Sequence, residues 1–223
     1  LKEVATGKKG IFNTIKKGSI YIDNTTASAT VARELHKNAK DHGFGFLDAP
    51  VSGGTKGAEA ASLAIMVGGK ATAFATAEPI FAAMGRPVHV GPTGAGQLSK
   101  LANQTIVAVT IGAVAEAMLL AEQGGADPAA LRKALKGGFA DSVILQQHGE
   151  RMSTGNFAPG GLSKFQLKDL DNVLAEASGL DLTLPVTQHI RDRFDHFVHE
   201  MDGADMDHSG LYLELKKQNG MDI

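Results

Sequence analysis

The chain has 223 residues, of which 43% are hydrophobic, enough to bury a sizeable core in one large or two modest domains. Its formal net charge of −2 provides no basic field, so nucleic acid and anionic membranes are not expected partners. The absence of cysteine excludes disulfides, thiol catalysis and cysteine-ligated zinc. We expect a globular protein, with the cytoplasm as its default compartment.

The first part of the chain alternates short apolar runs with helical patterns, which is typical of βα units around a mainly parallel sheet. Ser28 is a suitable N-cap and Gly43 a suitable stop for the first clear helix. The pattern predicts strands over 19–22, 44–47, 63–67 and 87–90, and helices over 29–41 and 71–84.

The spacing of apolar residues changes after Gly91, and the pattern in the rest of the chain indicates helices only. Asp127 followed by Pro128 is a strong helix start. The predicted helices cover 94–123, 127–136, 162–178 and 185–199. The expected domains are therefore an α/β part over 1–92, the remainder of a Rossmann-type dinucleotide-binding domain, and an all-α part over 93–223.

The segment from Leu98 to Leu120 is apolar nearly all round, so we expect a buried helix. Its length approaches that of a membrane span, but its polar residues and its many small residues favour packing inside a protein. Lys100 is the exception in this helix. It either extends from the helix into solvent or is a desolvated lysine suited to proton transfer.

Three segments carry a resemblance to a known family. The first is G-x-G-x-x-x-K from Gly94 to Lys100, the second is D-A-P-V-S-G-G over 48–54, and the third is K-D-L over 168–170. In this order and spacing they resemble the β-hydroxyacid dehydrogenases, the family of 3-hydroxyisobutyrate dehydrogenase and 2-hydroxy-3-oxopropionate reductase. The resemblance covers nearly the whole chain and implies NAD(P)-dependent interconversion of a small β-hydroxyacid and its semialdehyde.

The resemblance implies substrate and catalytic residues. Ser52, Gly53 and Gly54 would hold the substrate carboxylate on a tight turn whose backbone N–H groups face the anion. Lys100 would exchange a proton with the substrate hydroxyl, as general acid in the reductive direction. Asn103, one turn further, would orient the substrate or the lysine.

Further roles follow from the same resemblance. Gln104 occupies a substrate-side position at which many relatives carry a second Asn. Thr26 and Lys168 align with positions that contact the cofactor, although a turn or cap role for Thr26 and a solvated role for Lys168 are the ordinary alternatives. Phe165 could line the site, but a core role is the more ordinary expectation.

No G-x-G-x-x-G segment follows a strand and opens a helix. Compared with the family, the first strands and the glycine-rich turn are absent, so the sequence resembles a truncated dehydrogenase that by itself would bind dinucleotide weakly. The cofactor is expected to be NAD or NADP, which this chain does not distinguish because the residue that reads the ribose 2′ position belongs to that part.

Other interpretations stay open. The expected activity is that of a 2-hydroxy-3-oxopropionate reductase; 3-hydroxyisobutyrate dehydrogenase activity is the alternative, and a non-catalytic self-association module is an alternative of another class. Apolar faces on the 94–123 helix suggest a homodimer or homotetramer. His196 and His199 invite a metal interpretation, but their spacing and polar surroundings favour a solvated helix end, so no metal is expected.

Overall fold

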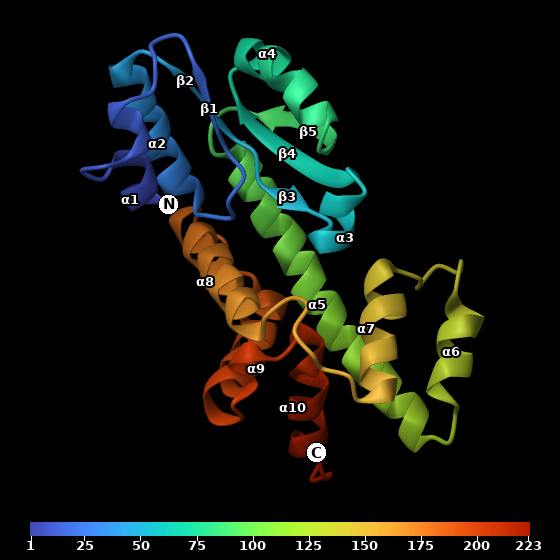
Figure 1. Ribbon diagram of the computed structural model, residues 1–223. Helices are drawn as coiled ribbons and strands as arrows, with labels where there is room; N and C mark the ends of the chain where they lie inside the picture. Colours follow the sequence, from blue (N-terminus) through green and yellow to red (C-terminus); the bar gives the residue numbers. More distant parts are fainter. The chain divides into compact units, whose positions relative to one another are not determined.

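The computed structural model describes residues 1–223 and contains two compact units, Leu1–Ala102 and Asn103–Ile223 (Figure 1). The boundary between them falls inside α5 (Ala95–Gln123), so this one helix contributes its first turns to unit 1 and the remainder to unit 2. The predicted domain boundary, at 92/93, lies a few residues ahead of this helix.

Unit 1 is an α/β unit, as predicted, and the four predicted strands and two predicted helices lie within a few residues of the predicted ranges. The short strand Val51–Ser52 and the short helices Lys2–Thr6 and Gly54–Glu59 were not predicted. Ser28 caps α2 by accepting a hydrogen bond from the Val31 amide at 3.2 Å, and Gly43 ends the helix with φ of 83°. The elements are α1 (Lys2–Thr6), a 3-10 turn (Ile11–Asn13), β1 (Ile20–Asp23), α2 (Ala29–His42), β2 (Gly45–Asp48), β3 (Val51–Ser52), α3 (Gly54–Glu59), β4 (Leu63–Gly69), α4 (Ala71–Ala82) and β5 (Gly85–Gly91).

The sheet is mixed rather than mainly parallel. β1 pairs with β2 and β4 pairs with β5 in parallel, as βα units require, but β2 and β3 both run antiparallel to β4. These two pairings share one register, so residues 45–52 act as one extended segment interrupted at Pro50, which has no N–H to donate. The reason is the connection to β4: α3 has only six residues, too few for a parallel crossover.

Alternate side chains of the strands face two separate cores, because successive residues of a strand point to opposite faces. Tyr21 and Phe46 pack with α2 and its neighbours, whereas Ile22 and Leu47 pack with α4. Figure 1 shows α2 and α4 on opposite sides of the sheet. This arrangement leaves the ends of the strands, and the loops that follow them, to carry functional residues.

Unit 2 contains only helices, as predicted. Asp127 caps α6 by accepting from the Ala130 amide at 2.6 Å. One core joins residues of α5, α7, α8, α9 and α10, among them Ile111, Phe194 and Tyr212, which are almost fully buried. The helices after α5 are α6 (Pro128–Leu135), α7 (Val143–Thr154), α8 (Ser163–Gly179), α9 (Pro185–Glu200) and α10 (Leu211–Gln218), with 3-10 turns at Gly203–Asp205 and His208–Gly210.

The prediction that α5 is buried all round is wrong for this chain. Ala108 and Ile111 lie in the core, but Ile106 is 65% exposed and Leu120 is 77% exposed. One side of the helix is sufficient to pack against α8 and α9, so the apolar residues of the other side remain at the surface. By length and composition α5 is also apolar enough to cross a membrane, a test that core helices of water-soluble proteins pass as well.

Candidate active site

Lys100 lies in the second turn of α5 and is buried, with 9% of its surface exposed. A lysine that extends freely into solvent from a helix end would be largely exposed. The structure therefore disagrees with the surface alternative. It places a buried lysine at the position that the resemblance assigns to catalysis.

The G-x-G segment ahead of Lys100 brings the start of α5 directly onto the sheet. Gly94 has φ of 94°, a left-handed conformation that favours glycine. A Cβ on Gly96 would collide with the main-chain oxygens of Asp48 and Met66, the second at 2.6 Å. These glycines thus allow the helix N-terminus to touch the backbone of β2 and β4.

Asp48, the last residue of β2, holds this helix end. Its Oδ1 accepts from the Gly94 amide at 2.9 Å and its Oδ2 accepts from the Gln97 amide at 3.0 Å. The carboxyl is fully buried, and burial raises its pKa although both hydrogen bonds act in the opposite direction. Because the same residue begins the D-A-P-V-S-G-G segment, it connects that segment to the helix that carries Lys100.

Gln97 connects the helix to a second loop. Its side chain is fully buried, accepts from the Ala27 amide at 2.9 Å and donates to the Thr25 carbonyl at 2.8 Å. Thr26 lies between these two contacts and is partly buried. The loop after β1 and the loop after β2 are therefore both attached to the first turn of α5.

Ser52, Gly53 and Gly54 form the turn from β3 into α3. Ser52 is partly buried and both glycines are exposed. Gly53 has φ of 142° and Gly54 has φ of 61°, so both positions favour glycine. No atom lies within 4 Å of a Cβ built on Gly54, so the backbone at this point faces open space.

In unit 2, three predicted residues share one network around Asp169. Gln104 donates through Nε2 to Asp169 Oδ2 at 2.8 Å, and Lys168 Nζ lies 2.8 Å from Asp169 Oδ1. Asn103 donates through Nδ2 to Gln104 Oε1 at 2.9 Å. The structure therefore joins Asn103, Gln104 and Lys168 through a carboxylate that the sequence did not single out, and it engages both ends of the Gln104 amide within unit 2.

One group of side chains in unit 2 has the donor set of a metal site. His148, Asp207 and His208 place ligand atoms within 4.8 Å of one another. Asp207, however, already accepts from the Gly161 amide at 2.9 Å and from the Ser209 amide at 3.0 Å. This arrangement favours a structural anchor.

His196 and His199 do not form such a group: His196 Nδ1 lies 3.5 Å from Glu214, and His199 Nε2 lies 3.7 Å from Asp195.

Phe165 is 55% exposed, so the expectation of a core role is wrong. It lies on the outer face of α8, where Lys164 Nζ stacks 5.7 Å above its ring.

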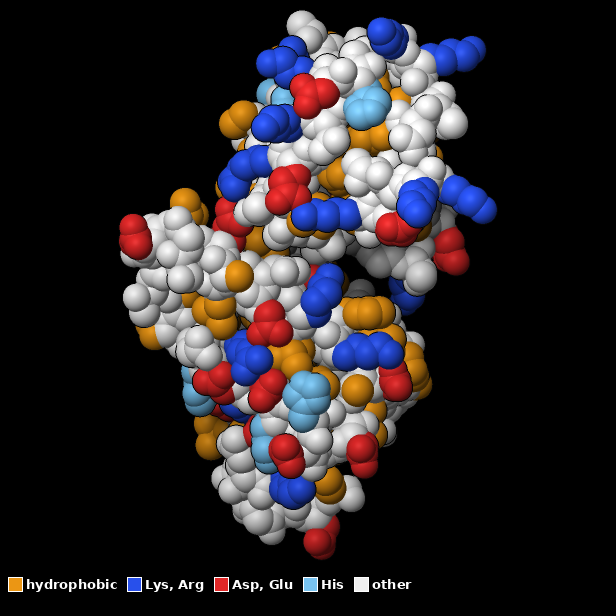
Figure 2. All heavy atoms as spheres, turned by 90° about the vertical axis from the view of Figure 1, so that its left-hand side faces the viewer, with side chains coloured by type: hydrophobic (Ala, Val, Ile, Leu, Met, Phe, Trp, Pro, Cys, Tyr) orange, Lys and Arg blue, Asp and Glu red, His pale blue; other side chains and the backbone are white.

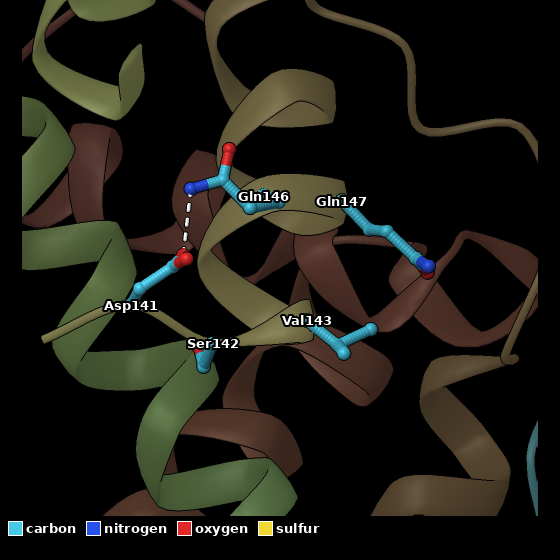
Figure 3. A pocket seen from close by; sticks show the side chains of 5 residues that line it. All are labelled: Asp141, Ser142, Val143, Gln146 and Gln147. Carbon is cyan, nitrogen blue, oxygen red and sulfur yellow. Dashed lines mark hydrogen bonds between the residues drawn. The ribbon is translucent and has the colours of Figure 1, made fainter. Parts of the chain in front are cut away.

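Unit 2 also has two surface hollows. The first is lined by the start of α7 and the residues ahead of it, where Gln146 donates to Asp141 at 2.7 Å (Figure 3). The second lies between the end of α8 and the start of α9. Neither is lined by a predicted site residue.

On the face that Figure 2 shows, basic and acidic side chains are interspersed, in line with the small net charge.

Two family models together match residues 1–215. Residues 1–94 match the NAD binding domain of 6-phosphogluconate dehydrogenase, and residues 94–215 match the NAD-binding domain of NADP-dependent 3-hydroxyisobutyrate dehydrogenase. Together with the buried Lys100 and its G-x-G segment, these matches are decisive. The chain belongs to the β-hydroxyacid dehydrogenase family. It is thus an NAD(P)-dependent hydroxyacid oxidoreductase by family.

Named relatives agree with this assignment. The chain is 40% identical to 2-hydroxy-3-oxopropionate reductase of Escherichia coli over 217 residues, which covers 97% of this chain and 74% of the relative. Among solved structures, 3-hydroxyisobutyrate dehydrogenase of Mycobacterium tuberculosis with L-serine matches at a TM-score of 0.83 and 33% identity, covering 92% of this chain and 73% of that one. The 3-hydroxyisobutyrate dehydrogenase of Salmonella typhimurium matches at a TM-score of 0.86 and 25% identity, covering 95% and 74%.

The cofactor of this dehydrogenase is NAD or NADP, and the loop after β1 is one candidate for contacting it. Thr26 offers a hydroxyl at the carboxyl end of a parallel strand, where doubly wound sheets bind ligands, and Gln97 is hydrogen-bonded to the main chain on either side of it. The Thr26 hydroxyl suits the nicotinamide amide, whereas a pyrophosphate needs a glycine-rich turn. Lys168 supplies a charge that suits a phosphate.

Sequence reasoning missed Asp48, Gln97 and Asp169 as site residues. Asp48 and Gln97 each lay inside a motif that we quoted, but their contacts join residues more than forty positions apart. Asp169 follows directly after Lys168, and an acidic residue beside a predicted cofactor lysine was a signal that could have been used.

Proposed function

We propose that this chain carries the catalytic and substrate-binding residues of a reductase that interconverts 2-hydroxy-3-oxopropionate and its hydroxyacid. The observation that carries the proposal is the attachment of the Lys100 helix, through Asp48, to the segment that ends in Ser52, Gly53 and Gly54. The E. coli relative named 2-hydroxy-3-oxopropionate reductase supports this choice of substrate.

Lys100 serves as the general acid of the reduction. Its ammonium donates a proton to the oxygen of the aldehyde as negative charge develops there, and the resulting neutral amine takes the proton back in the oxidative direction. The bound dinucleotide supplies or accepts the hydride. Burial of Lys100 excludes water from the amine and strengthens its interaction with the developing alkoxide.

Ser52, Gly53 and Gly54 bind the substrate carboxylate. The exposed backbone at both glycines leaves room for an anion to approach the main chain, and the Ser52 hydroxyl adds a hydrogen-bond donor. Asn103 follows Lys100 by one helical turn and orients the substrate hydroxyl or the amine. Thr26 and Lys168 contact the cofactor.

Gln104 has a different role from direct substrate binding. Its nitrogen donates to Asp169 and its oxygen accepts from Asn103, so its amide is committed to neighbours in unit 2. A carboxylate can only accept, which fixes the orientation of the Gln104 amide and then of the Asn103 amide. We expect Gln104 to hold Asn103 in place.

Two alternatives define the test. A 3-hydroxyisobutyrate dehydrogenase would carry out the same chemistry on a substrate with a methyl group in place of a hydroxyl. A non-catalytic self-association module would keep the helical unit without turnover, an alternative that the exposed apolar side of α5 supports. In the catalytic case we also expect a cytoplasmic homodimer or homotetramer.

The test is the oxidation of NADH or NADPH by the full-length protein with each of two aldehydes, 2-hydroxy-3-oxopropionate and 2-methyl-3-oxopropionate. The proposal expects a higher kcat/KM for the first. A higher value for the second would assign the 3-hydroxyisobutyrate alternative. No turnover with either, together with a stable oligomer in analytical ultracentrifugation, would assign the self-association module.

A further inference from the structure

Gln97 is a buried side chain in unit 1 that joins the start of α5 to the loop containing Thr26. Its surface is fully excluded from solvent, and both ends of its amide are hydrogen-bonded to main chain. A buried amide costs free energy unless each polar atom has a partner. These two partners lie about seventy positions away in sequence, so the contact is a tertiary one and not part of the helix itself.

The backbone of Gln97 makes a second connection. Its amide donates to Asp48 Oδ2 at 3.0 Å, so one residue is attached through its main chain to the end of β2 and through its side chain to the loop after β1. The close approach of Gly96 to the strand backbone leaves the helix no room to slide toward the sheet. The position of the first turn is thus fixed against both loops.

Lys100 follows Gln97 by three residues, so the two side chains lie on one face of the helix, one turn apart. The peptide segment that Gln97 holds has Thr26 at its centre. The separation between Thr26 and Lys100 is therefore set by a short and rigid connection: one turn of helix and one buried amide.

We propose that Gln97 is a positioning residue that fixes the nicotinamide side of the site, at Thr26, relative to the proton donor Lys100. This inference rests on the proposed function, in which hydride and proton arrive at adjacent atoms of one carbonyl group. Both transfers need reacting atoms within about 3–3.5 Å, and a displacement of about 1 Å can cost roughly a hundredfold in rate. Gln97 touches neither substrate nor cofactor in this account, so it acts through Thr26.

The test uses three variants. Gln97→Met has a similar length but removes both hydrogen bonds. Gln97→Glu keeps an acceptor for the Ala27 amide and replaces the donor to Thr25 with a second acceptor. Gln123→Met is the matched control, because Gln123 is an exposed glutamine at the end of the same helix.

The first measurement is hydrogen exchange of residues 24–28, which does not depend on catalysis. We expect the Ala27 amide to exchange about tenfold faster in Gln97→Met, the loss of about one hydrogen bond, and to stay protected in Gln97→Glu and in the control. Unchanged protection in Gln97→Met would overturn the attachment, whether or not the protein turns over any substrate.

The second measurement is kinetic, on the full-length protein with 2-hydroxy-3-oxopropionate. We expect kcat to fall between about tenfold and a hundredfold in Gln97→Met, with a larger primary deuterium isotope effect from 4-deuterated cofactor and little change in KM for the aldehyde. Gln97→Glu should lie between wild type and Gln97→Met. A kcat within twofold of wild type in a variant whose Ala27 amide exchanges rapidly would refute the positioning role. Absence of turnover in the wild-type protein would instead count against the proposed function.

Discussion

Replacing the buried Asp48 by alanine should lower the free energy of unfolding of unit 1 more than replacing an exposed aspartate by alanine. The change leaves the Gly94 and Gln97 amides without their acceptor in a buried setting, and an unsatisfied buried N–H costs about 1–3 kcal/mol. Part of this loss is offset because the variant no longer buries a carboxyl whose pKa burial raises. The net expected loss in the free energy of unfolding is about 3 kcal/mol.

Urea and thermal unfolding measure this loss directly. A change of about 3 kcal/mol in a chain of this size lowers the Tm by about 6–12 °C. Asp48→Asn keeps one acceptor oxygen and should lose about half as much. Asp41→Ala, at an exposed position of α2, is the control and should change the free energy of unfolding by less than about 0.5 kcal/mol. A loss below about 1 kcal/mol in Asp48→Ala would refute the anchoring role.

Three further predictions concern packing and pH. Burial lowers the pKa of His208 to about 4, below the unfolded value near 6.5, so the unfolded chain binds the proton more readily. The free energy of unfolding should therefore fall by up to ~3 kcal/mol as the pH is lowered from about 6.5 to about 4. In urea unfolding, His208→Asn should show a smaller change of stability over this pH range. Glu214→Ala should cost about 3 kcal/mol in the same assay, because buried Arg193 loses its 2.9 Å bond to Glu214 and keeps only the exposed Glu116 at 3.5 Å; an effect under about 1 kcal/mol would contradict this. Gly96→Ala should lower the Tm because its methyl group meets strand backbone, whereas Gly179→Ala, which meets no atom within 4 Å, should not.

Much of the fold could be predicted because its signals are local. The Ser28 cap, the Gly43 stop and the Asp127 cap each depend on a few neighbouring residues, and the structure has all three. The antiparallel pairing of β2 with β4 was not predicted, because direction depends on the length of the connection, and the short helix Gly54–Glu59 has no strong periodic pattern.

The partial burial of α5 illustrates a second limit of prediction from sequence. Apolar residues such as Ile106 and Leu120 fit a buried helix by composition, but exposure depends on which sides have neighbours, and composition does not give that. Phe165 was misplaced for the same reason.

Residues of the candidate site could be predicted only where a residue type is unusual among its neighbours in the sequence. Lys100 is a charge in an apolar helix, and Ser52 precedes two adjacent glycines, so each stands out in the sequence. Asp48 and Gln97 are ordinary polar residues whose partners are distant along the chain, and only the structure shows that both oxygens of one and both ends of the other are used.

The central claim is that Lys100 donates the proton to the substrate oxygen. The most direct test is the pH dependence of kcat/KM for the full-length protein with 2-hydroxy-3-oxopropionate, measured for wild type, Lys100→Met and Lys100→Arg alongside their Tm values. The account predicts that kcat/KM of the wild-type protein falls at high pH, that both variants keep their fold and lose at least about a hundredfold in kcat/KM, and that this high-pH fall is absent in both variants. A folded Lys100→Met protein that retains turnover within about tenfold of wild type, with the same pH profile, would contradict it.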